Sequence, residues 1–590
     1  MCAWRGPTCI GDRRRRRSRR PRYTHTDRGH RDTTAPRPSW THATGEIALP
    51  NETDVSPSAL APLRQPMFRM LWIAWLAANI TMWMNDVAAA WLMTSLTTSA
   101  FMVAMVQAAS TLPVFVLGLP SGALADIIDR RKYFAATQLW IAVAAILLCG
   151  LALADALTAE LLLALTFANG IGLAMRWPVF AAIIPDLVAR RDLPAALALN
   201  GVAMNMSRII GPVVAGALLA GAGSAYVFLL NALLSIFAFV MILRWKSEPK
   251  ISALPGERFL AAMRVGLQHV MQSPPMRAVL ARIFLFFLQS TSLTALLPLV
   301  VRDLQGGGAT VYTSLLAAMG GGAILTALNL ERLRHRLERE DFVSWGTLLH
   351  AACAAVVVLV PTLWAAVPAM FVAGMAWIAT ANALTVAAQM GLPNWVRARG
   401  MSIYQMALMG GSAAGAALWG YVANLTSVTI SILVASVIGP LVMLLTRRHA
   451  TIRPHDVDHS PAAVVAMLPP PAIDIEPDEG PVMVTIEYLI DPARVAGFNA
   501  VMQETRRARL RQGALSWGLF RDTARPERYI EYFLDENWIE HQRRLERFTA
   551  ADLGLRERRL AFHIGPDAPQ MRRYVAESVD GRPGSAADTR

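Results

Sequence analysis

Charged side chains are scarce in this 590-residue sequence: they make up 17% of it, whereas hydrophobic residues make up 54%. Soluble globular domains carry about 25% charged residues and about 45–50% apolar ones, glycine included. The shortage of charge therefore indicates a membrane protein. The net charge of +14 is spread over an Arg-rich head and short loops, and no compact basic domain carries it. We therefore expect no nucleic-acid partner.

Cysteine is also rare. The four cysteines are Cys2, Cys9, Cys149 and Cys353, and no Cys-x-x-Cys pair or Cys/His cluster occurs. A disulfide framework and a metal site are therefore not expected. The sequence also lacks the nucleotide-binding pattern Gly-x-x-x-x-Gly-Lys-Ser/Thr, which argues against a primary ATP-driven pump. We expect no cofactor, no bound metal and no enzymatic activity.

The head, residues 1–62, is rich in Arg, Thr and Pro and has no apolar stretch of the kind found in secretory signal peptides. Its composition predicts a disordered segment. Two interpretations stay open. Either the head holds the N-terminus in the cytoplasm and touches anionic lipid, or the start codon is assigned too far upstream.

Long apolar stretches, in contrast, are abundant. A helix needs about 20 apolar residues to cross the hydrocarbon core of a bilayer. Twelve such stretches fall into two sets of six, in bundles over residues 63–244 and 277–448, with a polar cytoplasmic linker over 245–276. They cover residues 69–94, 99–123, 133–155, 159–187, 195–220 and 223–244, then 277–301, 308–330, 341–361, 363–390, 398–424 and 426–446. The pattern predicts a polytopic α-helical membrane protein with 12 transmembrane helices in 6+6 pseudo-repeats.

The loops between these stretches alternate in basic content. One alternate set holds Arg130, Arg131, Lys132, Arg190, Arg191, Arg244, Lys246, Lys250, Arg258, Arg264, Arg332, Arg334, Arg336, Arg339, Arg397, Arg399, Arg447 and Arg448. The other set holds almost no Lys or Arg beyond Arg302. Because basic loops stay in the cytoplasm, the alternation places both termini and the central linker there. It predicts a multi-pass protein of the cell inner (plasma) membrane, with the lipid bilayer as its surroundings.

The segment between the second and third stretches has a glycine, an aspartate four residues later and then a basic pair: Gly122, Asp126, Arg130 and Arg131. This pattern resembles the loop motif of the major facilitator superfamily. Two positions depart from it, because Ile127 replaces a basic residue and Asp129 replaces a glycine. The resemblance implies a conformational role in which Asp126 caps a neighbouring helix or pairs with an arginine, bracing one end state.

The fifth stretch contains Gly211, Pro212 and Gly216, and it resembles the Gly- and Pro-rich fifth helix of exporters in this superfamily. Small residues there let helices pack closely, and Pro212 offers a bend. The eleventh stretch repeats the feature with Gly410, Gly411, Gly415 and Gly420, as internal repeats predict. Within the superfamily the chain resembles the subgroup of the enterobactin exporter, transmembrane secretion effectors and macrolide-efflux proteins. That resemblance implies a secondary active transporter.

A Pro-rich linker over residues 449–481 precedes a second region. Alternating and amphipathic segments predict strands at 482–490, 515–522, 528–534 and 556–564 and helices at 493–512 and 537–548. This order is that of a small α+β ferredoxin-like domain over 482–565, followed by a disordered tail over 566–590. The domain resembles the antibiotic-biosynthesis-monooxygenase-like domain, which implies that it can form homodimers.

Ionisable groups deep in a membrane span are functional candidates, because their burial is costly. Asp86 lies far into the first stretch and Arg208 near the middle of the fifth. We predict that Asp86 is the group that takes up and releases protons and that Arg208 is its partner or tunes it, since low dielectric favours the protonated form of a carboxyl group. A fixed structural pair is the alternative. Further candidates for the substrate cavity are Asn79, Trp83, Gln107, Gln138, Asn169, Arg176, Gln289, Asn382, Gln389 and Gln405.

These features together predict export of a small amphipathic molecule (a siderophore, a drug or a secondary metabolite) by proton antiport. The partners are then the small-molecule substrate and protons. Two alternatives stay open: an uptake carrier, or a membrane-tethered enzyme or sensor that acts through the C-terminal domain.

Overall fold

A computed structural model describes residues 60–245, 259–304, 307–334, 339–447 and 471–577, together with Ser460 and Ala462. The head up to residue 59, parts of both linkers and the chain beyond residue 577 lie outside the described residues, and so do the predictions made for them.

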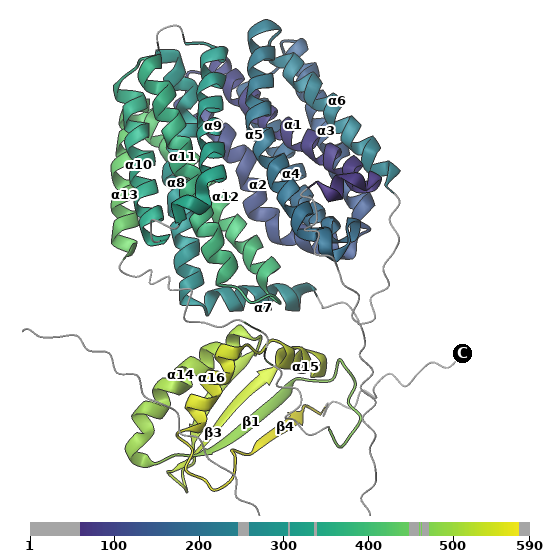
Figure 1. The fold of residues 1–590 in the computed structure, drawn as a ribbon, viewed down its shortest axis with the longest axis vertical. Coiled ribbons are helices and arrows are strands. Elements are labelled where there is room, and N and C mark those ends of the chain that lie inside the picture. Colours follow the sequence, from purple (N-terminus) through teal and green to yellow (C-terminus); the bar gives the residue numbers. More distant parts are fainter. Residues whose placement is uncertain are drawn as a thin grey trace, which may run out of the picture. The chain divides into compact units, whose positions relative to one another are not determined.

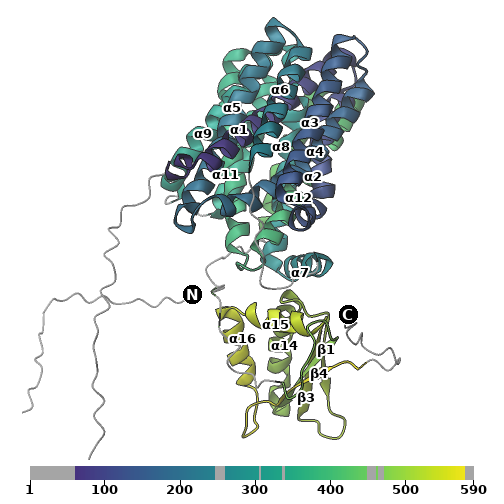
Figure 2. The ribbon, with the colours of Figure 1, turned by 90° about the vertical axis from the view of Figure 1, so that its right-hand side faces the viewer.

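In these described ranges, twelve long helices form the two predicted sets of six (Figures 1 and 2). The first set is α1 (Pro66–Leu96), α2 (Ala100–Ile127), α3 (Arg130–Leu153), α4 (Ala159–Leu187), α5 (Leu193–Gly221) and α6 (Ser224–Arg244). The short amphipathic helix α7 (Phe259–Met271) follows. The second set is α8 (Pro274–Asp303), α9 (Ala309–Arg334), α10 (Arg339–Leu359), α11 (Leu363–Met390), α12 (Arg397–Leu425) and α13 (Val428–Arg447).

Among the described residues, eleven helices are long and apolar enough to cross a membrane, and α1 is not one of them. Helix α1 carries the polar residues Asn79, Asn85 and Asp86 in its interior. At 1.5 Å per residue its 31 residues are still long enough to cross the hydrocarbon core. The polar residues of α1 therefore reduce its apolar character without shortening it.

Side-chain caps fix where several of these helices begin. The side chain of Asp129 accepts from the backbone N–H groups of Arg131 and Lys132 at 2.9 and 3.1 Å and so caps α3. Asp129 is the residue that departs from the loop motif, and capping gives it a local role. The guanidinium of Arg131 donates to the carbonyl oxygen of Leu243 at the end of α6. Arg130 is the first residue of α3, whereas the surroundings of Gly122 and the side chain of Asp126 in α2 lie outside the described part.

Glycines of α12 allow its close approach to two neighbours, as the sequence predicts. A Cβ atom at Gly411 or Gly415 would collide with the backbone of α8, at Phe284 and Leu288 respectively. On another side of α12, a Cβ at Gly410 would meet the ring of Phe115 on α2 at 2.7 Å. Helix α12 therefore packs closely against α2 of the first set and α8 of the second.

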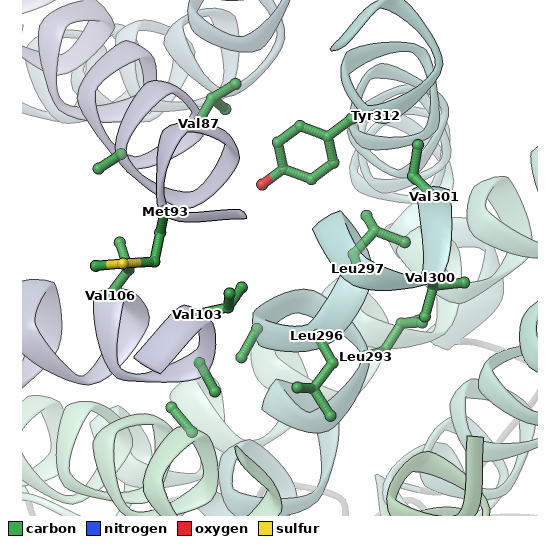
Figure 3. Packing of buried hydrophobic residues seen from close by; sticks show 14 of the residues in the cluster. Val87, Met93, Val103, Val106, Leu293, Leu296, Leu297, Val300, Val301 and Tyr312 are labelled. Carbon is green, nitrogen blue, oxygen red and sulfur yellow. The ribbon is translucent and has the colours of Figure 1, made fainter. Parts of the chain in front are cut away.

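Buried hydrophobic clusters differ between the two ends of the bundle. One cluster spans both sets of helices and includes Val103 of α2 and Leu296 of α8, with Tyr312 of α9 beside them (Figure 3). At the other end, one cluster is built from the first set alone, around Phe134 and Phe180. A separate cluster there is built from α7 and the second set, around Phe286 and Tyr404. The two sets thus share a core at one end only.

The C-terminal region forms one antiparallel sheet of four strands in the order β2-β3-β1-β4. Its elements are β1 (Val482–Leu489), α14 (Val495–Arg511), β2 (Ser516–Arg521), β3 (Arg528–Asp535), α15 (Trp538–Glu546), α16 (Ala550–Leu560) and β4 (Met571–Val575). Alternate residues of β1 are buried, from Val482 to Tyr488, and pack with Phe498 and Met502 of α14. The predicted β-α-β-β-α start of this region is confirmed.

The predicted final strand at 556–564 is wrong, because most of that segment belongs to helix α16. Thr549 and Asp552 form a capping box that starts this helix, and Leu555 and Arg559 lie four residues apart on its buried face. The final strand is β4, which pairs with β1. The predicted disordered tail from residue 566 is therefore wrong for 571–575, where strand pairing with β1 orders a charge-rich segment.

A charged network lies inside this region. The buried carboxylate of Glu531 accepts from Arg509 Nε at 3.0 Å, Trp517 Nε1 at 3.1 Å and the Tyr488 hydroxyl at 2.9 Å. Burial disfavours its charge, but the guanidinium groups of Arg509 and Arg559 and the hydrogen bonds outweigh burial and lower the pKa of Glu531 to about 2. Glu531 is therefore an ionised carboxylate whose acceptors are occupied.

Candidate functional site

A cavity of about 480 Å³ lies among the long helices. Its lining residues come from α1, α2, α4 and α5 of the first set and from α8, α9, α11 and α12 of the second. Six predicted residues line it: Trp83, Asp86, Gln107, Arg208, Asn382 and Gln405. The cavity therefore brings together some of the predicted residues from both sets, and the symmetric choice of helices is what internal repeats predict.

Asp86 is held by a neighbouring helix. The hydroxyl of Ser110 on α2 donates to Asp86 Oδ1 at 2.9 Å. In the described part of the chain no other hydrogen bond and no ion pair reaches this carboxylate. Ser110 also lines the cavity, three residues after Gln107 and hence on the same face of α2. This spacing is a signal by which sequence reasoning could have found Ser110.

Arg208 lies between two indole rings. Its Cζ atom is 5.5 Å from the ring centroid of Trp83 on α1 and 4.7 Å from that of Trp377 on α11. The described contacts of Arg208 include no ion pair, so the structure does not join it directly to Asp86. The predicted proton-coupling residues thus share one cavity while each has a partner of its own.

Aromatic residues that the sequence reading missed supply much of the remaining wall. Trp177, Tyr312 and Trp377 line the cavity, and Tyr312 stacks with Trp91 at a centroid distance of 5.7 Å. These residues stand in apolar stretches where nothing in the sequence marks which face of the helix they occupy. Together with several methionines and Phe287 they make the wall largely apolar.

Arg176 does not line the cavity and instead joins α4 to α1. The guanidinium donates to the Ala78 carbonyl at 2.7 Å and to Asn79 Oδ1 at 3.4 Å, and it lies 5.1 Å from the Trp75 ring centroid. Asn79 is buried in the same contact and donates to the Trp75 carbonyl at 2.8 Å. Both predicted cavity residues therefore contribute to helix packing.

Four further predicted residues also lie away from the cavity. Gln138 on α3 and Asn169 on α4 are buried in the first set. Gln289 is buried on α8, where Gly439 of α13 leaves room for its side chain. Gln389 is exposed at the end of α11. These side chains therefore lie at helix interfaces or at the end of a helix. Their positions depend on how each helix is rotated about its own axis, which the sequence alone does not give.

The cavity does not have the chemistry of a metal centre. Within the described ranges, no three His, Cys, Asp or Glu residues come together in a way that could hold a metal ion. One carboxylate, one guanidinium, amide groups, hydroxyl groups and indole N–H groups form its polar surface. This set can bind a small amphipathic molecule through apolar contact and a few oriented hydrogen bonds.

Comparison with known proteins places these features in a family. The family described as "Transmembrane secretion effector" matches residues 57–580. The staphyloferrin A transporter of Staphylococcus aureus is 22% identical over 254 residues, which are 42% of this chain and 63% of that protein. Macrolide efflux protein A of Streptococcus pyogenes is 26% identical over 249 residues, 41% of this chain and 60% of that protein. The matched part thus spans less than two thirds of either relative.

Solved structures show the same fold at low sequence identity. The nucleoside transporter NupG has a TM-score of 0.52 and 13% identity, and the match covers 65% of this chain and 99% of that one. A POT family transporter in complex with 5-aminolevulinic acid has a TM-score of 0.52 and 13% identity, covering 65% and 96%. These similarities concern the arrangement of the long helices.

Proposed function

The chain belongs to the transmembrane secretion effector family of major facilitator transporters, and on that premise we propose that it exports a small amphipathic molecule by proton antiport. A siderophore, a drug or a secondary metabolite fits the cavity's mixture of apolar wall and few polar groups. The family is one of transporters rather than of enzymes, so the chemistry to explain is binding, proton exchange and conformational change.

The observation that supports this proposal is the position of Asp86 in the cavity. A single carboxylate, bonded to Ser110, faces a chamber lined by both halves of the bundle. A carboxyl group at that place can exchange a proton whenever the cavity opens to one side, and substrate bound in the same chamber competes with or releases that proton. Proton movement and substrate movement are then coupled, because the proton and the substrate bind in the same cavity.

The hydrophobic clusters support an assignment of the side of the membrane toward which the bundle is closed. The two sets of helices share a core at the end that carries the short loops poor in Lys and Arg, and they have separate cores at the end with the basic loops. If the basic loops are cytoplasmic, as the positive-inside rule predicts, the bundle is closed toward the outside. We propose this inward-facing state as the one that loads substrate for export from the cytoplasm across the inner membrane.

The C-terminal sheet is proposed to be an accessory domain of the antibiotic-biosynthesis-monooxygenase-like kind that forms homodimers. Support comes from the sheet face opposite α14, where Phe520 is 60% exposed and stacks with Tyr532 at 5.5 Å. Tyr574 of β4 is also 44% exposed on that face. Exposed aromatic side chains on a sheet face are typical of a protein interface. Light scattering of the full chain with Phe520→Glu, compared with wild type, tests the dimer.

The transport proposal is tested by comparing small molecules inside and outside cells that lack the gene with cells that carry it again. A compound retained by the deletion strain and released on complementation identifies export. A compound left in the medium by the deletion strain would show uptake instead. No change in either pool would exclude transport under those conditions and turn attention to the C-terminal domain.

Proton coupling is tested with Asp86→Asn in the full chain reconstituted in vesicles. We expect substrate exchange without a gradient to persist, because the amide fills the same space. Movement driven by a pH gradient should be lost. Wild-type behaviour of Asp86→Asn under a pH gradient would exclude the proton role of this residue.

A further inference from the structure

The cavity has one positive charge, Arg208, and two of its three guanidinium nitrogens lack a hydrogen-bond acceptor within the described residues. The Nε and Nη1 atoms of Arg208 are buried and have no acceptor within the described residues. The guanidinium contacts the faces of Trp83 and Trp377 instead. A cation–π contact is worth about 0.5–2 kcal/mol, which offsets only part of the cost of burying a charge.

Two further donors beside the same cavity are in the same situation. The indole Nε1 atoms of Trp83 and Trp177 are buried without an acceptor in the part of the chain that the structure describes. Both residues line the cavity together with Arg208. Trp83, Trp177 and Arg208 lie on α1, α4 and α5, respectively. All three helices belong to the first set, so the three residues line the side of the chamber that this set forms. This side therefore carries a positive charge and buried N–H groups to which the described residues supply no acceptor.

The carboxylate of Asp86 lies one helical turn from Trp83 on α1 and is bonded to Ser110 rather than to Arg208. The cavity thus has a negative group and a positive group that do not neutralise each other by direct contact. Because the donors are planar, directed and partly desolvated, the group that satisfies them is an anion with several acceptor oxygens. A neutral molecule would leave the charge of Arg208 uncompensated.

We propose that the transported molecule carries a carboxylate, phosphate or sulfonate group, and that Arg208, with the indole N–H groups of Trp83 and Trp177, binds that group. This inference rests on the proposed transport function and adds the charge class of the substrate. The rings of Trp83 and Trp377 then position the guanidinium to bind the anion before the substrate enters the cavity. Arg208 is in this view a specificity-determining residue, and Asp86 keeps the separate task of proton exchange.

The test uses the full chain in complemented deletion cells, with every variant normalised to its amount in the membrane. Compounds that wild type releases are sorted by their net charge at neutral pH. We expect them to carry an anionic group, and we expect Arg208→Gln to reduce their release about tenfold or more. Arg208→Lys keeps the positive charge but lacks the planar guanidinium, so we expect it to release these compounds at a rate between those of wild type and Arg208→Gln. Arg302→Gln removes an exposed guanidinium at the end of α8, away from the residues that line the cavity, keeps both Asp86 and Arg208, and is the matched control.

A double variant separates substrate binding from a structural pair. If Arg208 only balances Asp86 in another state of the transport cycle, Asp86→Asn with Arg208→Gln should restore gradient-independent exchange relative to Arg208→Gln alone. That rescue would overturn the proposal, as would release of only neutral or cationic compounds by wild type. Unchanged release by a membrane-inserted Arg208→Gln variant would also overturn it while leaving the transport function intact. If wild type shifts no compound at all, the transport function itself fails.

Discussion

The hydroxyl of Ser110 on α2 donates a hydrogen bond of 2.9 Å to the carboxylate of Asp86 on α1. The bond joins the first two helices at the wall of the cavity, and Thr111 beside it donates to the Gln107 carbonyl of its own helix at 2.8 Å. Two adjacent hydroxyl groups therefore have different tasks. One touches the carboxylate proposed to carry the proton, and the other stays within the backbone of α2.

Ser110→Ala should shift the pH dependence of transport while leaving the fold unchanged. A hydrogen bond to a charged group is worth about 1.5–3 kcal/mol, and its donor favours the ionised carboxylate. We expect the pH profile of proton-driven transport to move by about one unit or more toward higher pH. Initial rates in vesicles across a series of pH values measure the shift. Thr111→Val is the control, and an equal shift in that variant would contradict a specific role of Ser110.

The crossing of α9 and α11 depends on two glycines that face each other's helix. A Cβ at Gly322 would overlap the carbonyl oxygen of Phe371, and a Cβ at Gly374 would overlap that of Met319. Backbone atoms cannot move aside as a flexible side chain can, so we expect Gly322→Ala to cost about 1–3 kcal/mol of stability. The measurement is the temperature at which the detergent-solubilised chain loses its monodisperse peak in size-exclusion chromatography.

Gly150→Ala on α3 is the matched control for this prediction. A Cβ at Gly150 meets no atom within 4 Å, and alanine favours the helix relative to glycine. Stability should therefore stay equal or rise in the control. A Gly322→Ala variant as stable as the control would contradict the close approach of α9 and α11.

The long helices could be predicted from the sequence because each one needs a continuous apolar stretch. Helices α4 (Ala159–Leu187) and α11 (Leu363–Met390) begin and end where the sequence predicts, and the other spans differ by only a few residues. The rotation of each helix about its axis could not be predicted. Lipid and neighbouring helices are both apolar, so the sequence pattern does not separate Gln107, which lines the cavity, from Gln138, which is buried in packing.

The C-terminal region shows a different limit. Its first strand was predictable because one face is buried and the other is not, which gives the alternation of Val482–Leu489. The final strand was not predictable from the sequence. Met571–Val575 contains two arginines, and only its pairing with β1 makes it a strand. Arg509 and Glu531 are also buried against the usual preference for charged residues, because each compensates the other.

The C-terminal region should be dispensable for transport itself. Every residue that lines the cavity lies between Met82 and Ser412. A chain that ends after Arg448 is therefore expected to retain exchange of substrate in vesicles at a rate within a few fold of the full chain. Complete loss in a truncated chain that still inserts and stays monodisperse would show that the C-terminal region takes part in the transport cycle.

The buried carboxylate of Glu531 should control the stability of the C-terminal sheet. Glu531→Gln keeps the shape but leaves Arg509 and Arg559 without their counter-charge, and breaking a buried pair costs about 3–5 kcal/mol. We expect peptides over β1 and β3 to exchange their amide hydrogens at least about a hundredfold faster in the full-length variant. Glu487→Gln is the control, because its ion pair with Arg528 is partly exposed and therefore contributes little to stability.

The same carboxylate predicts how acid affects this sheet. Its pKa is lowered to about 2 from an ordinary value of 4.5, so its charge stabilises the fold fully above about pH 4.5. That contribution falls as the pH drops from about 4.5 toward 2, where the folded carboxylate itself takes up a proton. Protection of β3 in wild type, corrected for intrinsic exchange, should decline over this range, and Glu531→Gln should lack this part of the decline. A variant with the same acid dependence as wild type would assign the stabilising charge to another residue of the network.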